Sequence, residues 1–113
     1  DTTEAQRVVF EKAYEKGVTL LYGTDAAVRP HDMGGWQFAT MVERGMRPID
    51  AIRSATSVAA EHMGLSADVG AVAPGKLADL IAVRGDPLAD AEILRDVTVV
   101  IQAGVIIKAP ATD

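Results

Sequence analysis

The sequence of 113 residues predicts an α/β fold followed by an all-β tail. Three observations support this prediction. An amphipathic helical pattern leads directly into a short apolar run, the order typical of a strand in a parallel sheet. Two more helical patterns follow after a glycine-rich loop. Beyond Ser66 the apolar period shortens to that of strands. We therefore expect a domain boundary here, with residues 1–65 in the α/β part and residues 66–113 in the β part.

The first predicted helix covers residues 4–16, where Ala5, Val8, Val9 and Ala13 recur at helical spacing and Gly17 stands at the C′ position. Residues 18–22 then form an almost unbroken apolar run that predicts a strand buried on both faces. Residues 23–35 contain three glycines and a proline, so we expect a loop that leaves the carboxyl end of that strand. In open sheets and barrels alike, that end carries the chemistry.

Two helices are predicted after this loop. Residues 36–44 place Phe38, Met41 and Val42 on one face, and Gly45 ends the helix. Pro48 opens a second helix that Gly64 closes. Its expected buried stripe consists of Ile49, Ile52, Ala55, Ala59 and Met63.

The tail predicts two β-hairpins. Residues 69–73 and 77–83 flank the turn Pro74-Gly75, and residues 97–101 and 105–107 flank Gln102-Ala103-Gly104. Ala103 is poorly suited to the second turn if that turn requires a positive φ. We expect Asp79 to accept backbone N–H bonds near a strand end and to have no contact with substrate. Because one parallel strand and isolated hairpins are marginal alone, both parts should need further strands.

Composition excludes several classes of function. Sixteen acidic and eleven basic residues argue against a nucleic-acid partner. The absence of cysteine excludes a disulfide scaffold, a thiolate zinc site and a cysteine nucleophile. Apolar stretches are too short to span a membrane, so we expect no membrane partner. The absence of cysteine leaves the compartment open, and we expect a cytoplasmic location. Any targeting segment would precede residue 1.

The sharpest candidate for chemistry is Asp25 in Gly23-Thr24-Asp25, directly after the predicted strand. A carboxylate there can act as a metal ligand or a general base, or it can cap a turn. His31, on the same loop, can orient a substrate or bind a metal, or it can pair with Asp32. His62 has no second histidine at zinc-binding spacing, so we interpret it as structural. The methionines are expected to fill the core.

The motifs, taken in order, resemble the C-terminal part of the metal-dependent amidohydrolase superfamily, in the branch that includes imidazolonepropionases and Xaa-Pro dipeptidases. The matching segments are Gly23-Thr24-Asp25-Ala26, Pro30-His31, Gly45-Met46-Arg47-Pro48, Ala51-Ile52, Ala55-Thr56, Ala59-Ala60, Gly64, Pro74-Gly75-Lys76, Ala78-Asp79-Leu80 and Gly85-Asp86-Pro87-Leu88.

This resemblance implies the last helix-strand-helix unit of a (β/α)8 TIM barrel followed by part of an appended β-sandwich. It implies one or two divalent metals, most simply zinc, that activate water to cleave an amide or other C–N bond of a small molecule. Asp25 would contact the metal and take the proton of the bound water. His31 would border the substrate pocket. The family's other metal ligands lie on earlier strands and have no counterpart in these residues.

We therefore expect a segment of a longer enzyme that relies on the remaining barrel strands of its parent chain and is inactive alone. A homo-oligomer is an open alternative. The rival function is a catalytically silent scaffold of the same superfamily, which metal content would distinguish from an enzyme. A third interpretation, an independent binding domain, predicts a cooperative thermal transition for the 113 residues alone.

Overall fold

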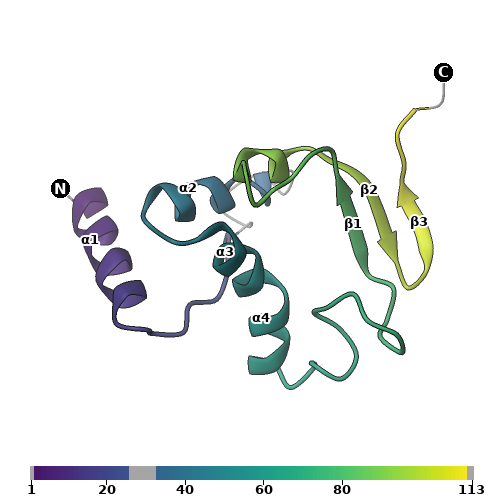
Figure 1. Ribbon diagram of the computed structural model, residues 1–113, viewed down its shortest axis with the longest axis horizontal. Coiled ribbons are helices and arrows are strands. Elements are labelled where there is room, and N and C mark those ends of the chain that lie inside the picture. The colour runs from purple at the N-terminus through teal and green to yellow at the C-terminus, as the bar shows by residue number, and fades with distance from the viewer. Residues whose placement is uncertain (1, 26–32, 112–113) are drawn as a thin grey trace.

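The structure is a computed structural model, and it describes residues 2–25 and 33–111. Helices occupy the N-terminal part and a small antiparallel sheet the C-terminal part (Figure 1). The elements are α1 (Thr2–Glu15), α2 (Gln37–Glu43), α3 (Pro48–Ala55), α4 (Ser57–His62), β1 (Leu80–Val83), the 3₁₀ helix η2 (Ala91–Arg95), β2 (Val97–Gln102) and β3 (Val105–Lys108).

Glycine ends three of the four α-helices as the sequence predicts. Gly17, Gly45 and Gly64 all have positive φ, between 73° and 97°. At each helix end the residue after the glycine donates its N–H to the carbonyl five residues back, as in the bond from Val18 to Ala13 of 3.0 Å. The glycine itself bonds three residues back, which completes a Schellman motif. These helix ends are confirmed.

A small core joins α1, α2 and α3. Its buried residues are Met41, Met46 and Ala51, with Phe10, Tyr14, Leu20, Tyr22, Phe38 and Val42 packed around them. Polar contacts add to this packing where α1 meets α3, because the Tyr14 hydroxyl donates to Asp50 at 2.5 Å. The Arg47 guanidinium also bonds Asp50, at 2.8 Å. Hydrogen bonds from Arg47 and Tyr14 lower the pKa of Asp50 below its ordinary value.

The predicted buried strand at residues 18–22 is wrong for this structure, which forms neither strand nor helix there. Val18 is 54% exposed and Leu21 is 48% exposed. A strand needs the backbone of a neighbour, and the described residues offer none beside this segment. The Tyr22 N–H donates instead to the carbonyl of Ser54, at 3.1 Å.

The single helix predicted from Pro48 to Gly64 is broken at Thr56. Thr56 has φ −126° and ψ −95°, outside the helical region, and its hydroxyl donates to the Ile52 carbonyl at 2.8 Å. The predicted buried stripe is also displaced, because Ala51, Ser54 and Ala60 are the buried residues. Met63 is 69% exposed and fills no core. Met63 lies instead on the side of α3 and α4 that lines an open groove.

The sheet has the order β1-β2-β3, and both pairs are antiparallel. The predicted first hairpin is wrong, because β1 pairs with β2 and residues 69–73 form no strand. Its turn is nonetheless present: Lys76 N–H donates to the Ala73 carbonyl at 3.2 Å, and Gly75 has φ +86°. Gly70 explains the missing strand, since its φ is +93° and its backbone lies against α4, where a Cβ would come within 2.6 Å of the Ala60 Cβ.

The second hairpin, β2 with β3, is confirmed. Ala103 and Gly104 form its two-residue turn with φ of 49° and 79°, the type I′ geometry that favours asparagine or glycine. The Asp79 carboxylate accepts the N–H of Ala103 at 2.8 Å, and the Ala78 carbonyl accepts that of Gly104 at 3.1 Å. The expected structural role of Asp79 is therefore confirmed.

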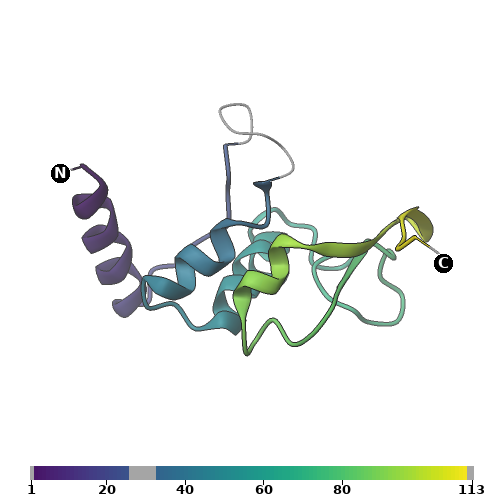
Figure 2. The same ribbon diagram turned by 90° about the horizontal axis from the view of Figure 1, so that it is seen from above.

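The molecule is extended, with the helices at one end and β3 at the other (Figure 2). Its radius of gyration is 15.2 Å, against about 13 Å for a compact domain of this length. It exposes 7941 Å², whereas a compact protein of its mass exposes about 6,000 Å². Within the described ranges, no helix has the length and apolar character needed to cross a membrane.

Candidate active site around Asp25

Asp25 is an exposed carboxylate at the end of the segment that follows α1. Its φ is 51°, in the left-handed region that few residues other than glycine and the small polar ones adopt. Residues held in such a conformation cluster at functional sites. Among the residues that the structure describes, Asp25 has no hydrogen bond and no ion pair. Its oxygens are therefore available to a ligand from outside this set.

Tyr22 fixes the segment three residues before Asp25. Its N–H donates to Ser54 of α3, and its ring stacks on Phe38 of α2 with centroids 4.3 Å apart and planes 22° apart. Its hydroxyl donates to the backbone carbonyl of Gly34. Burial raises the pKa of the Tyr22 hydroxyl above its ordinary value, so the group stays protonated and remains a donor.

Residues 34–36 rest on η2 in the C-terminal part. A Cβ at Gly35 would lie 2.1 Å from the Leu94 carbonyl oxygen, so only glycine permits this approach. The Arg95 guanidinium lies over the Trp36 ring, 4.3 Å from its centroid, in a cation–π contact. The two parts of the chain therefore meet next to Tyr22.

The histidines do not complete a site with Asp25 in the described part of the chain. His31 lies outside the described residues. His62 is exposed on α4, where its Nδ1 lies 3.1 Å from the Val58 carbonyl of its own helix. Within residues 2–25 and 33–111, no three histidine, cysteine or acidic side chains are grouped to hold a metal ion. The Asp25 carboxylate, without a partner among the described residues, can serve as an oxygen ligand to a divalent cation, but it supplies one ligand of the several that such an ion needs.

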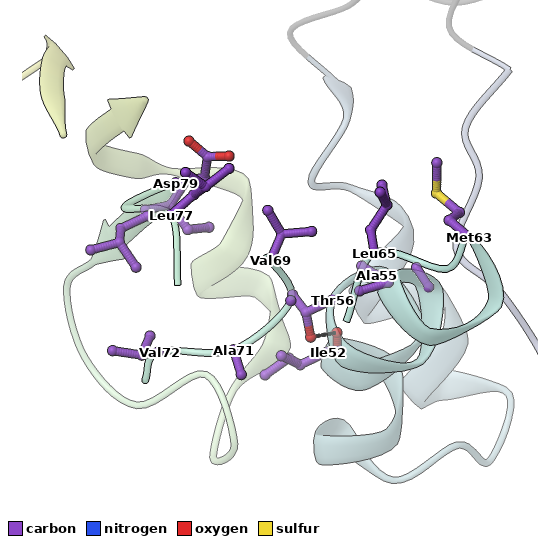
Figure 3. Close-up of a pocket in the computed structure, with 15 residues that line it drawn as sticks. Ile52, Ala55, Thr56, Met63, Leu65, Val69, Ala71, Val72, Leu77 and Asp79 are labelled. Carbon is purple, nitrogen blue, oxygen red and sulfur yellow. Dashed lines mark hydrogen bonds between the residues drawn. The ribbon is translucent and has the colours of Figure 1, made fainter. Parts of the chain in front are cut away.

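An apolar cavity lies elsewhere in the described part of the chain. It is an open groove of about 530 Å³ between the α3–α4 face and residues 69–81 (Figure 3). Ile52, Ala55 and Met63 lie on one side, with Val69 and Val72 opposite. The carboxylate at its rim, Asp79, is already bonded to Ala103. This groove therefore offers apolar surface and no reactive group of its own.

The comparison with known families decides the identity of the chain. The profile of the Amidohydrolase family matches residues 2–108. The chain belongs to this family. Similar solved structures agree with that assignment. A Xaa-Pro dipeptidase with bound methionine in its active site is 44% identical with a TM-score of 0.88, over 91% of this chain and 25% of the other.

Two further amidohydrolase relatives show how far the similarity extends. A prolidase complexed with N-methylphosphonate-L-proline is 31% identical with a TM-score of 0.80, over 91% of this chain and 26% of the other. Adenine deaminase 3 of Rhizobium meliloti (strain 1021) is 50% identical over 40 residues, which are 35% of this chain and 7% of that protein. The chain thus spans about a quarter of the length of the solved structures it resembles.

The sequence singles out Asp25 as a candidate but does not indicate the groups around it in this amidohydrolase. In the sequence, Tyr22 is one residue of the apolar run 18–22, and nothing there indicates that its hydroxyl bonds the Gly34 carbonyl. The pair Gly34-Gly35 before Trp36 did carry a signal, because adjacent glycines beside a large aromatic residue indicate a close backbone approach. The partner of that approach, Leu94, lies too far along the chain to be predicted.

Proposed function

We propose that this chain is the part of a metal-dependent amidohydrolase that carries the last strand-end carboxylate of a (β/α)8 barrel, Asp25. The proposed boundary between barrel and β-sandwich lies at residues 65 and 66. The observation that carries the proposal is the state of Asp25, an exposed carboxylate with φ of 51° and no partner among the described residues. Family membership over residues 2–108 makes hydrolysis of a C–N bond the reaction to test first.

Asp25 would act as the proton acceptor and donor of this reaction. A divalent metal, most simply zinc, lowers the pKa of water toward neutrality and so supplies a nucleophile when it is bound. The Asp25 carboxylate would take the proton that the attacking water loses. It can then give that proton to the nitrogen as the C–N bond breaks, so that carboxyl and amine products form. His31 remains a proposed neighbour of the substrate.

The proposed substrate is a small amide of the dipeptide type. The similar solved structures include a Xaa-Pro dipeptidase and a prolidase, each matched over 91% of this chain. The adenine deaminase match covers 35% of it. Cleavage of a dipeptide and deamination of adenine both break a C–N bond with water, so the chemistry proposed for Asp25 is the same for either substrate. Xaa-Pro dipeptides are therefore the first substrates to assay and adenine the second.

Asp25→Asn in the full-length protein tests this function. Asparagine preserves the shape of the side chain and one neutral oxygen but removes the basic group. We expect folding to survive and kcat to fall at least about a hundredfold, since general acid–base groups contribute about 10²–10⁴-fold. Steady-state kinetics and bound metal should be measured on the same preparation.

Asp86→Asn is the matched control. Asp86 Oδ1 accepts the N–H of Leu88 at 2.9 Å in an exposed turn, and the oxygen of asparagine can accept the same bond. We expect its kcat and melting temperature to remain near those of the wild type. Near-normal turnover by Asp25→Asn at full metal occupancy would refute the catalytic assignment.

A further inference from the structure

Tyr22 connects three separate parts of the chain immediately before Asp25. Its backbone is bonded to α3, its ring lies on α2, and its hydroxyl bonds the carbonyl of Gly34. Residues 23 and 24 separate it from Asp25. With the backbone N–H, one ring face and the hydroxyl of Tyr22 engaged, little freedom is left in the direction from which the chain reaches Asp25.

Gly34 is itself part of a fixed segment. Gly35 contacts the Leu94 carbonyl so closely that a side chain is excluded, and Trp36 lies under Arg95. Both contacts are made by η2, which packs against α2. Figure 2 shows η2, in green, alongside the blue α2. The acceptor of the Tyr22 hydroxyl is therefore anchored to the C-terminal part of the molecule.

We propose that Tyr22 is a positioning residue for Asp25, and that η2 supports it by holding Gly34–Trp36 in place. This inference rests on the proposed function, because it assigns a part in the reaction to a residue that does not touch the substrate. The physical reason is the sensitivity of rate to geometry: displacing a catalytic group by about 1 Å costs about a hundredfold. A tyrosine that only packs would stabilise the fold without this effect on rate.

Tyr14 offers a matched comparison within the same chain. Its hydroxyl is also partly buried and hydrogen-bonded, to Asp50 and to the N–H of Arg47, but it joins α1 to α3 away from Asp25. Tyr22→Phe and Tyr14→Phe therefore each remove one partly buried, hydrogen-bonded hydroxyl. The Tyr22→Phe ring can still stack on Phe38, so the packing of the core is preserved.

The experiment compares these two variants of the full-length metal-loaded protein. For Tyr22→Phe we expect kcat to fall about tenfold with little change in KM or bound metal, and the amides of residues 23–25 to exchange hydrogen faster. For Tyr14→Phe we expect a lower melting temperature with unchanged kcat and unchanged exchange at residues 23–25. Unchanged kcat in Tyr22→Phe would overturn the proposal, as would equal losses of kcat in both variants.

Arg95→Met tests the support from η2 and serves also if Tyr22→Phe does not fold. It removes the cation over Trp36 and keeps an apolar side chain of similar length. We expect a severalfold fall in kcat and faster exchange at residues 23–25. Unchanged exchange and kcat would overturn the role of η2.

Hydrogen exchange separates failure of this inference from failure of the proposed function. If the wild-type protein hydrolyses no C–N bond, the proposed function fails, and with it any catalytic consequence of Tyr22. If the wild type is active but exchange at residues 23–25 is the same in Tyr22→Phe, the positioning role fails and the function stands.

Discussion

At the scale of single residues, two aspartates that look alike in the sequence have opposite surroundings. Asp25 follows an apolar segment and has no partner among the described residues, whereas Asp79 precedes β1 and accepts the Ala103 N–H. The Asp79 carboxylate therefore has a structural bond, whereas the proposed role of Asp25 needs a carboxylate without such a bond. A residue's hydrogen bonds therefore separate roles that residue type leaves open.

Replacing Asp79 by asparagine should affect stability only. The asparagine oxygen can keep the bond to Ala103, but the bond loses its charge and weakens. We expect the melting temperature of the full-length protein to fall by a few degrees and kcat to remain near the wild-type value. Thermal unfolding and steady-state kinetics check this together. A large loss of kcat in a normally stable variant would contradict it.

Which residues could be predicted depends on how local their interactions are. The position of Asp25 after an apolar run makes it a candidate whose role stays a prediction, whereas the structural role of Asp79, predicted from its place near a strand end, is confirmed by its bond to Ala103. Tyr22 was missed because its partners, Gly34, Phe38 and Ser54, are 12 to 32 residues away. A single sequence has no signal for such pairs.

At the scale of elements, helix ends were predicted well and strand pairs less well. A Schellman motif involves six consecutive residues, so the sequence around Gly17 or Gly64 determines it. The partner of β1 depends on contacts between residues far apart in the sequence. Residues 69–73 are nearer to β1 along the chain, but Gly70 lies against α4, and β1 pairs with β2 instead. The segment 18–22 has the composition of a buried strand, but no described neighbour pairs with it.

The turn between β2 and β3 gives a prediction for one element. Ala103 is held at φ 49°, which costs an alanine about 1 kcal/mol and asparagine less. Ala103→Asn creates the Asn-Gly pair that type I′ turns favour. We expect the free energy of unfolding of the full-length protein to rise by about 0.5–1 kcal/mol, with unchanged activity. Urea unfolding measures this gain, and a loss of stability would show that the turn adopts another geometry.

At the scale of the whole molecule, the incomplete ligand set and the large exposed area each predict how the 113 residues behave on their own. A polypeptide of these 113 residues should bind zinc weakly, because the described residues supply one carboxylate toward a site that needs three or four ligands. It should also unfold without a sharp transition, given its large exposed area. Calorimetric titration with zinc and a thermal scan check the two parts. Tight stoichiometric binding would contradict the first, and a cooperative transition the second.

The outer edge of β3 has a consequence for how the polypeptide behaves before it is fully assembled. Along one edge β3 pairs with β2, and no described strand pairs with its other edge. Three of its residues are each at least 60% exposed: Val105, Ile106 and Ile107. An apolar edge with unpaired backbone groups is a template on which other chains can aggregate. Lys108 and Pro110 follow at once, and a charge and a proline are the residues that limit such growth. On β3 itself, residues 105–107 are thus the apolar stretch open to such pairing, and Lys108 borders it directly.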